Sequence, residues 1–206
     1  MSTLRLVAVT AGLSRPSSTR LLTDRLTGAT HRLLAERGVT VEVETVELRD
    51  LAVDIATAMT TGFPVGRLRE ALDAAARADA LIAVTPVFTA SYSGLFKSFF
   101  DVLDKDALTG TPVLIAATGG TARHSLALEH GLRPLFAYLR ALVLPTGVYA
   151  ASEDWGTTDG LASRIERAAG ELADQLSEGR GRAGATADAF EDVTPFAQRL
   201  AGLYER

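Results

Sequence analysis

The chain has 206 residues, enough for one α/β domain with a tail but too few for two full catalytic domains. Its residues are 47% hydrophobic and 22% charged, and the net charge of -4 gives no basic field for a nucleic-acid backbone. The absence of cysteine excludes disulfides, thiolate nucleophiles and cysteine-bound metal centres. No signal peptide or membrane-spanning apolar run is evident. We therefore expect a cytoplasmic protein that binds neither nucleic acid nor membrane and takes any redox chemistry from a bound cofactor.

Short apolar runs alternate with helical patterns along residues 1–178. In the strand runs, Val and other apolar residues follow one another without a polar face, as in strands buried on both sides. The helical segments carry apolar residues three and four positions apart. In chain order we expect strands over Leu4–Thr10, Val39–Val46, Ala80–Thr85, Pro112–Thr118 and Leu142–Tyr149, and helices over Ser18–Arg37, Val65–Ala78, Gly94–Leu103, Arg123–Ala141 and Leu161–Leu176.

This alternation predicts an α/β fold with a doubly wound, five-stranded parallel sheet and helices on both faces, because parallel strands need long crossover connections. In such sheets ligands bind beyond the carboxyl ends of the strands, where the strand order reverses. The loops after the first, third and fourth strands are therefore the candidate sites.

Residues 179–206 are expected to form a linker and a short tail outside this domain. Gly179 to Asp188 is a low-complexity linker rich in glycine and alanine. Apolar residues then recur at helical spacing, at Phe190, Val193, Phe196, Leu200 and Leu203. We interpret the tail as amphipathic and favour packing on its own domain or on a second subunit over binding a separate partner.

The loop after the first strand places a glycine and several hydroxyls at the start of a long helix. Unpaired backbone N–H groups and the helix dipole favour an anion there, and hydroxyls can donate to a phosphate without adding charge. A simple N-cap role for a serine is the equal alternative. There is no GxxxxGK[ST] loop, and no GxGxxG follows the first strand, so the usual nucleoside triphosphate and dinucleotide fingerprints fail. A phosphate bound mainly by hydroxyls and amides after the first strand is the arrangement of flavodoxins. The candidate phosphate-binding residues are Ser14, Arg15, Ser17, Ser18 and Thr19.

The segment after the third strand, TPVFTASYSGLFKSFFD from Thr85 to Asp101, carries a specific resemblance. It resembles the flavodoxin-like NADPH-dependent FMN reductase family, in which a TP-aromatic turn leads into a Gly-Leu-Lys helix with an Asp four residues after the Lys. The resemblance implies that the turn lies against the flavin ring and that the helix from Gly94 takes part in a dimer interface. The cofactor-binding residues implied here are Pro86, Val87, Phe88, Thr89 and Ser91.

The loop after the fourth strand is rich in glycine and opens another helix. Small residues allow the backbone to approach a planar ring and to donate N–H groups to it. The motif ATGGT with His124 three residues after it, followed by LEHGLRPL over Leu128–Leu135, is similar to that of the alkanesulfonate and methanesulfonate FMN reductases, which supply reduced flavin to a separate monooxygenase. The resemblance covers roughly residues 4–150. The candidate flavin-binding residues are Thr118, Gly119, Gly120, Thr121 and His124.

The chain also departs from the wider reductase family. Many members have Tyr-Asn after the Pro, a second Pro before the Gly and Trp after the Asp, where this chain has Phe88, Thr89, Ser93 and Val102. These departures put nucleotide preference and quinone or azo-dye activity in doubt more than flavin binding, and they favour the sulfonate-type branch.

Several lone residues could serve either a ligand or an ordinary structural role. His124 and His130 are six residues apart, on different faces of a regular helix, so no metal site is expected. His130 falls where the resemblance implies a helix irregularity at a tetramer interface. Trp155, after the fifth strand, is near enough in topology to cover a ligand, but core packing is favoured. Guanidinium groups that could bind the phosphates of NAD(P)H belong to Arg15, Arg20 and Arg123.

The sequence thus predicts an NAD(P)H-dependent FMN reductase that assembles as a homodimer or homotetramer. Its cofactors are FMN and NADPH or NADH, and hydride passes between them without a catalytic side chain. The recipient of reduced FMN is expected to be a luciferase-like flavin monooxygenase. An FMN-retaining quinone or azo reductase and a flavodoxin-type electron carrier are the alternatives. A phosphoacceptor domain is disfavoured because Thr85 stands where an Asp is needed.

Overall fold

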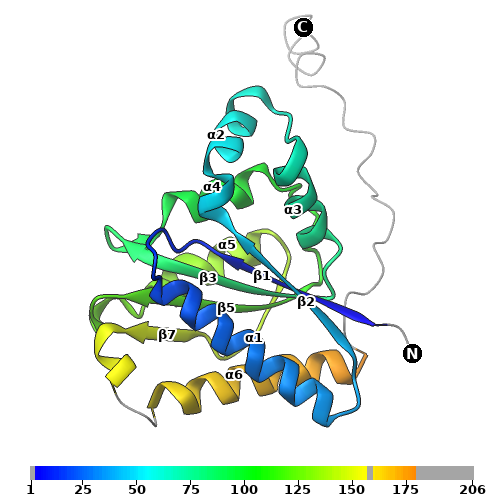
Figure 1. The fold of residues 1–206 in the computed structure, drawn as a ribbon, viewed down its shortest axis with the longest axis vertical. Coiled ribbons are helices and arrows are strands. Elements are labelled where there is room, and N and C mark those ends of the chain that lie inside the picture. The colour runs from blue at the N-terminus through cyan, green and yellow to red at the C-terminus, as the bar shows by residue number, and fades with distance from the viewer. Residues whose placement is uncertain (1–2, 157–159, 180–206) are drawn as a thin grey trace, which may run out of the picture.

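The computed structural model describes residues 3–156 and 160–179. Figure 1 shows a central sheet whose strands are connected by helices. Its strands are β1 Leu4–Thr10, β2 Val41–Glu47, β3 Ala80–Phe88, β4 Ser91–Tyr92, β5 Pro112–Gly119, β6 Leu142–Val143 and β7 Val148–Ala151. The α-helices are α1 Ser18–Glu36, α2 Ala52–Thr61, α3 Gly66–Ala76, α4 Gly94–Val102, α5 Arg133–Tyr138 and α6 Gly160–Ser177. Short 3-10 helices occupy Leu48–Leu51, Ala122–His124 and Ser152–Gly156, and a π-helix occupies Leu128–Leu132.

The strand order confirms the expected fold class. Along the sheet the order is β2-β1-β3-β5-β6, with every neighbouring pair parallel. This is the flavodoxin-like order, in which the direction of winding reverses between the first and third strands. The carboxyl ends of the parallel strands lie at one edge of the sheet, on the left in Figure 1.

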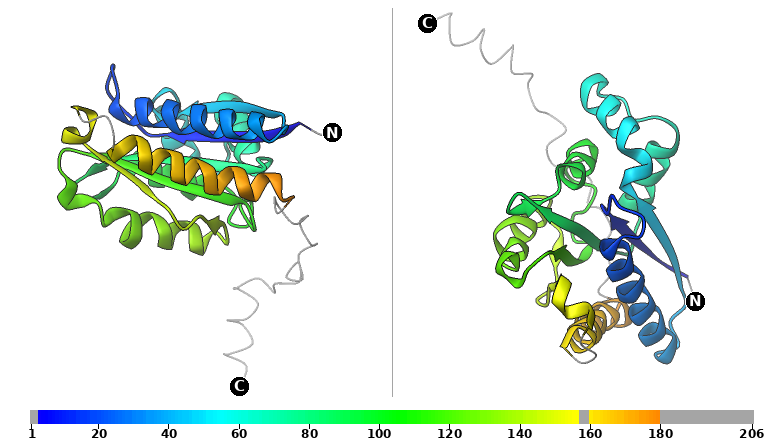
Figure 2. Two further views of the ribbon diagram at one scale, coloured as in Figure 1. Left: turned by 90° about the horizontal axis from the view of Figure 1, so that it is seen from below. Right: turned by 60° about the vertical axis from the view of Figure 1, so that its left-hand side comes forward.

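Helices cover both faces of this sheet, and each face has its own apolar core. On one face, α1 and α6 lie side by side (Figure 2) and pack Leu22, Leu26 and Leu172 against Leu6 and Ile82 of the strands. On the other face, α2 to α5 and the π-helix cover the alternate residues of the same strands, among them Val7, Val9, Leu81 and Ile115. Because successive strand residues point to opposite faces, continuous apolar runs bury both sides, as predicted.

The number of strands differs from the expected five, since the sheet has seven. The expected strand Leu142–Tyr149 is interrupted: β6 and β7 both pair with β5, and Pro145 lies between them without an N–H for the ladder. The other additional strand is β4, which pairs antiparallel with an extension of β3 beyond Thr85. The five positions across the parallel sheet are nonetheless those predicted.

The single helix predicted over Arg123–Ala141 is wrong. The segment instead forms a 3-10 turn, then the π-helix, and then α5. Pro134 supplies no N–H and its ring opposes a regular helical turn, while the preceding residue Arg133 donates its N–H to the carbonyl of Leu128, five residues back. The sequence analysis also left α2 unassigned.

The remaining expectations concern the tail and the membrane. The predicted linker Gly179–Asp188 and the amphipathic tail lie outside the described residues, apart from Gly179 itself. Across residues 3–156 and 160–179, no helix is long and apolar enough to cross a membrane.

Candidate active site

The loop after β1 is held in place before any ligand is considered. An ideal Cβ at Gly12 would overlap the hydroxyl of Ser17 and lie 3.1 Å from the Cβ of Thr19, so a glycine is required for the chain to approach the start of α1 this closely. Ser17 is the N-cap of α1, and its hydroxyl accepts a hydrogen bond from the N–H of Arg20 at 3.2 Å. The capping role weighed for this cluster therefore belongs to Ser17, while Ser18 is exposed beside it.

Charged residues that follow β2 fix the outer part of the same loop. Arg49 donates to the carbonyl of Ser14 at 2.8 Å, and Arg15 pairs with Asp50 at 3.3 Å. The sequence analysis missed this support. The available signal was the alternation of acidic and basic residues directly after the second strand, in Glu47 to Asp50.

The arginines at the start of α1 are already paired with carboxylates. Arg20 forms ion pairs with Asp24 at 2.8 Å and with Glu47, which also pairs with Arg49. These carboxylates and hydrogen bonds raise the pKa of Arg20. An anion at this helix start would therefore be bound by backbone N–H groups and hydroxyls more than by free guanidinium groups.

A buried hydrogen bond joins the start of α1 to the end of β5. The hydroxyls of Thr19 and Thr118 lie 2.8 Å apart, and both residues are at most 3% exposed. Each hydroxyl therefore has a partner inside the protein. This contact links the predicted phosphate-binding loop to the predicted flavin-binding loop.

The segment after β3 forms a tight hairpin instead of a plain loop. Phe88 pairs with Ser91, and the two residues between them have positive φ angles, 49° at Thr89 and 69° at Ala90. Two successive left-handed residues are the geometry of a type I′ turn, which Thr and Ala adopt at some cost. The return strand is anchored because the Ser93 N–H donates to the Thr85 hydroxyl at 3.0 Å. The hairpin thus projects Phe88, which is 48% exposed, at the carboxyl edge of the sheet.

The two glycines after β5 have different structural roles. An ideal Cβ at Gly119 would overlap the hydroxyl of Tyr149, whereas a Cβ at Gly120 would meet no protein atom within 4 Å. The Tyr149 hydroxyl donates to the carbonyl of Thr121 at 2.8 Å and so fixes the loop. Burial, with a smaller effect of the Asp154 carboxylate, raises the pKa of Tyr149. Gly119 is therefore required by the fold, and Gly120 faces open space.

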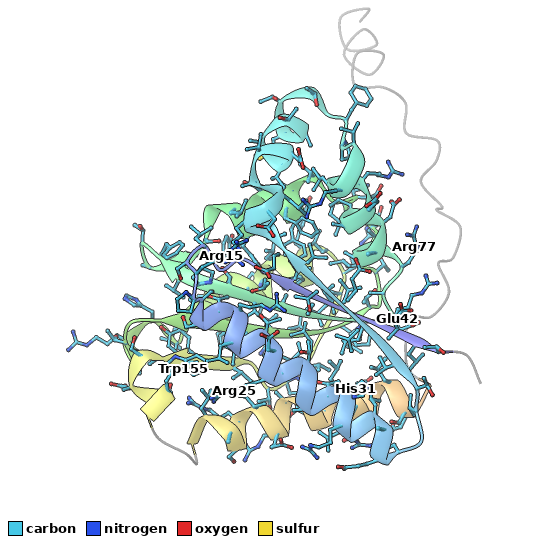
Figure 3. All side chains as sticks on the ribbon, in the orientation of Figure 1. Arg15, Arg25, His31, Glu42, Arg77 and Trp155 are labelled. Atoms are coloured by element: carbon cyan, nitrogen blue, oxygen red, sulfur yellow. The ribbon has the colours of Figure 1, made fainter. Side chains whose placement is uncertain are left out.

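These loops border an open cavity of about 300 Å³ at the carboxyl edge of the sheet. The predicted site residues in its lining are Ser18, Pro86, Val87, Phe88, Thr118, Gly119 and Gly120. Ser152 and Trp155 complete the lining, and the sequence analysis had not assigned either to the site. Trp155 is partly buried and packs against the apolar core, as predicted, but it also borders the cavity. Arg25 of α1 lies over its ring, 5.1 Å from the ring centre (Figure 3).

The other predicted site residues lie outside this lining. Some support it: Thr19 is buried beneath the loop, Ser17 caps α1, and Thr121 accepts from Tyr149. Others lie further out: Ser14 and Arg15 are on the outer loop, which Figure 3 shows at Arg15, and Thr89 is at the hairpin tip. Ser91 and His124 border a neighbouring hollow.

The cavity offers the polar and apolar surfaces that a bound flavin mononucleotide needs. At one end, the Ser18 hydroxyl stands at the start of a helix whose first N–H groups lack helical partners. Apolar side chains of Pro86, Val87, Phe88 and Trp155 form walls for a planar ring. At Gly120, the absence of a side chain leaves the backbone open to a ring. Fold and site together define a flavodoxin-like flavoprotein.

Comparison with known proteins identifies the family more closely. Residues 4–156 match the family model described as NADPH-dependent FMN reductase, and the chain belongs to this family. It is an NAD(P)H-dependent FMN reductase, an oxidoreductase whose cofactors are FMN and NAD(P)H. The family resemblance and the enzyme class predicted from sequence are confirmed.

Named relatives cover most of the chain. An FMN reductase (NADPH) of Pseudomonas aeruginosa is 40% identical over 87% of this chain and 95% of its own length. The NADH-dependent FMN reductase SfnF of Pseudomonas fluorescens is 41% identical over 81% of this chain and 88% of its own. A crystal structure of an oxidoreductase from Corynebacterium diphtheriae, 50% identical, superposes with a TM-score of 0.83 over 86% of this chain and 99% of that one.

Proposed function

We propose that this reductase binds FMN in the cavity at the carboxyl edge, reduces it with NAD(P)H and releases it to a separate flavin-dependent monooxygenase. The observation that carries the proposal is the lining of the cavity, which holds apolar side chains, hydroxyls and glycines but no ionisable acid or base. Such a site can bind and orient a flavin, and it offers no general acid or base for a chemistry of its own.

Each part of the lining has a proposed role toward FMN. The Ser18 hydroxyl and the first N–H groups of α1 hold the phosphate, and the Thr19–Thr118 hydrogen bond keeps them next to the ring-binding loop. Pro86 to Phe88 and Trp155 exclude water from the ring faces. The backbone N–H groups at Gly120 and Thr121 would donate to the flavin, and Tyr149 holds this loop in position through the Thr121 carbonyl.

The reaction needs positioning more than proton transfer. FMN, when bound, supplies the hydride acceptor. The protein brings the nicotinamide ring to within hydride-transfer contact and excludes water, which converts an encounter in solution into a reaction inside one complex. The loops around the cavity contain glycines and hydroxyls, as this division of labour requires.

The composition of the same site also supports release of reduced FMN, the product. The cavity lining contains no charged side chain that could bind the phosphate. Arg20, at the start of α1, is paired with carboxylates. Binding through hydroxyls and backbone N–H groups is compatible with exchange of FMN between turnovers. A luciferase-like monooxygenase is the proposed recipient, because the ATGGT loop resembles the motif of the sulfonate-type reductases. The proposal includes a cytoplasmic homodimer or homotetramer.

The test is to purify the protein without added flavin and to follow oxidation of NADH and NADPH with and without FMN. We expect largely colourless protein, turnover that saturates with FMN, and transfer of reduced FMN to a purified luciferase-like monooxygenase. A yellow protein indifferent to added FMN that reduces quinones rapidly would establish the quinone reductase instead. FMN binding without NAD(P)H oxidation would establish the electron carrier.

A further inference from the structure

A second hollow is bordered, like the proposed flavin cavity, by residues of the β3–β4 hairpin and of the loop after β5. It has a volume of about 200 Å³. Two chain segments lead from one cavity to the other: Phe88 borders the flavin cavity and its hairpin partner Ser91 borders the hollow, while Gly120 borders the cavity and Arg123 the hollow. The residues that line the hollow are Ala90, Ser91, Arg123, His124, Leu126, Ala127, His130 and Gly131.

The broken helix is what brings the basic residues of this hollow together. On a regular helix His124 and His130 would face different ways. Here His124 ends the 3-10 turn and His130 lies in the π-helix, and both border the same space as Arg123. The expectation that the two histidines face apart is therefore wrong.

The charge of the lining has one sign. Its ionisable side chains are Arg123, His124 and His130, and no carboxylate is among them. The nearest acid along the chain, Glu129, is bound to Arg133 by two hydrogen bonds of 2.6 and 2.9 Å, which lower its pKa. Arg133, outside the hollow, is the main partner of this carboxylate, and His130 of the hollow has a smaller effect on it. Since the lining itself holds Arg123 and no carboxylate, an anionic ligand is favoured there.

Arg123 differs from the other arginines that were candidates for nucleotide phosphates. Arg15 is paired with Asp50, and Arg20 with Asp24 and Glu47. Within residues 3–156 and 160–179, the Arg123 guanidinium has neither an ion pair nor a side-chain hydrogen bond, and the residue is exposed. A guanidinium group without an internal partner can form bidentate hydrogen bonds with a phosphate.

We propose that this hollow, lined by Arg123, His124 and His130, binds the phosphates of NAD(P)H while the nicotinamide ring lies against the flavin. The proposal rests on the proposed function, because it places the second substrate beside the FMN cavity. It also changes the expected role of His124, which borders the phosphate subsite and not the flavin cavity. The phosphate could be the diphosphate shared by NADH and NADPH or the 2′-phosphate of NADPH alone.

The test compares Arg123→Gln with wild-type protein and with Arg167→Gln. Arg167 is an exposed arginine of α6 outside the lining of either cavity, so this control removes the same charge elsewhere. The KM values for NADPH and NADH are measured at saturating FMN. Binding of NADP+ and NAD+ is measured by calorimetry, and FMN affinity by flavin fluorescence.

For Arg123→Gln we expect KM and the dissociation constant of the oxidised nucleotide to rise about tenfold, the scale of a lost charge-assisted hydrogen bond, with FMN affinity unchanged. An equal rise for both nucleotides assigns the diphosphate to the hollow, and a rise for NADPH and NADP+ alone assigns the 2′-phosphate. Arg167→Gln should match the wild-type protein in every measurement.

Two results would overturn the subsite. One is an active wild-type protein whose Arg123→Gln variant has unchanged KM and nucleotide affinity. The other is an equal weakening by Arg167→Gln, which would show only a loss of overall charge. A wild-type protein that oxidises neither nucleotide would instead contradict the proposed function itself, so the two failures are distinguishable.

Discussion

Gly119 is the position where a single methyl group should affect folding more than flavin chemistry. In the Gly119→Ala variant the new Cβ would overlap the Tyr149 hydroxyl and lie 3.1 Å from the ring carbon Cζ. Tyr149 is only 4% exposed, so its ring has little room to move, and its hydrogen bond to the Thr121 carbonyl would be lost. Overpacking costs about 1–3 kcal/mol and the hydrogen bond about 1 kcal/mol. We expect the free energy of unfolding to fall by about 2–4 kcal/mol.

A double-mutant cycle with Tyr149→Phe isolates the cause. The single Tyr149→Phe change should cost about 1 kcal/mol, since only the hydrogen bond to Thr121 is removed. In the double variant the hydroxyl that opposes the Cβ is absent, and only the tight contact to the ring carbon remains. The loss of unfolding free energy in the double variant should therefore be smaller, by about 2 kcal/mol, than the sum of the losses in the two single variants.

Urea unfolding followed by circular dichroism measures all four proteins, with equal m values as the condition for comparing midpoints. The matched control is Gly120→Ala, whose Cβ meets no protein atom within 4 Å, so its stability should stay within about 1 kcal/mol of wild type. The reasoning is refuted if Gly119→Ala is as stable as Gly120→Ala, or if the losses in the cycle simply add.

The remaining predictions concern the flavin cavity and its supports. Gly120→Val should fold normally but lose FMN-dependent NAD(P)H oxidation, because its side chain enters the space proposed for the ring; near-normal turnover would contradict this. Ser18→Ala should weaken FMN binding by about 1–3 kcal/mol, measured by fluorescence titration, and unchanged affinity would remove Ser18 from the phosphate site. Thr118→Val should lower the free energy of unfolding by about 1–3 kcal/mol because the Thr19 hydroxyl is left buried without its partner. The Thr19→Val/Thr118→Val pair should recover much of that loss, and a purely additive loss would refute the role of the bond. Burial raises the pKa of Tyr149, so the stabilising contribution of its neutral hydroxyl is present below about pH 10 and is lost as pH rises through the folded pKa. In that range the free energy of unfolding should fall more steeply for the wild-type protein than for Tyr149→Phe. Parallel pH profiles of the two proteins would contradict this prediction.

The fold class and the location of the candidate site could be predicted from the sequence because both depend on local patterns. Apolar runs alternating with helical spacing fixed the order of strands and helices, and the right-handed connection rule left few ways to arrange them. Since the carboxyl ends of parallel strands meet at one edge, the loops at Ser18, Phe88 and Gly120 were expected to converge. The structure places all three around one cavity. The family resemblance, carried by motifs in these loops, was equally accessible from the sequence.

The sequence by itself determined most of the strands and helices and the chemistry of the loops, while the tertiary structure decided the break within the predicted helix Arg123–Ala141 and which partner each side chain has. Gly119 and Gly120 look alike in sequence, yet only the packing of Tyr149, from a distant strand, makes one a requirement of the fold and leaves the other open to a ligand. Likewise, the sequence makes Arg20 and Arg123 equal candidates for a phosphate, and only the fold places Glu47 beside Arg20. The physical reason is that pairing and burial depend on residues far apart in the chain, which periodicity and local spacing do not record.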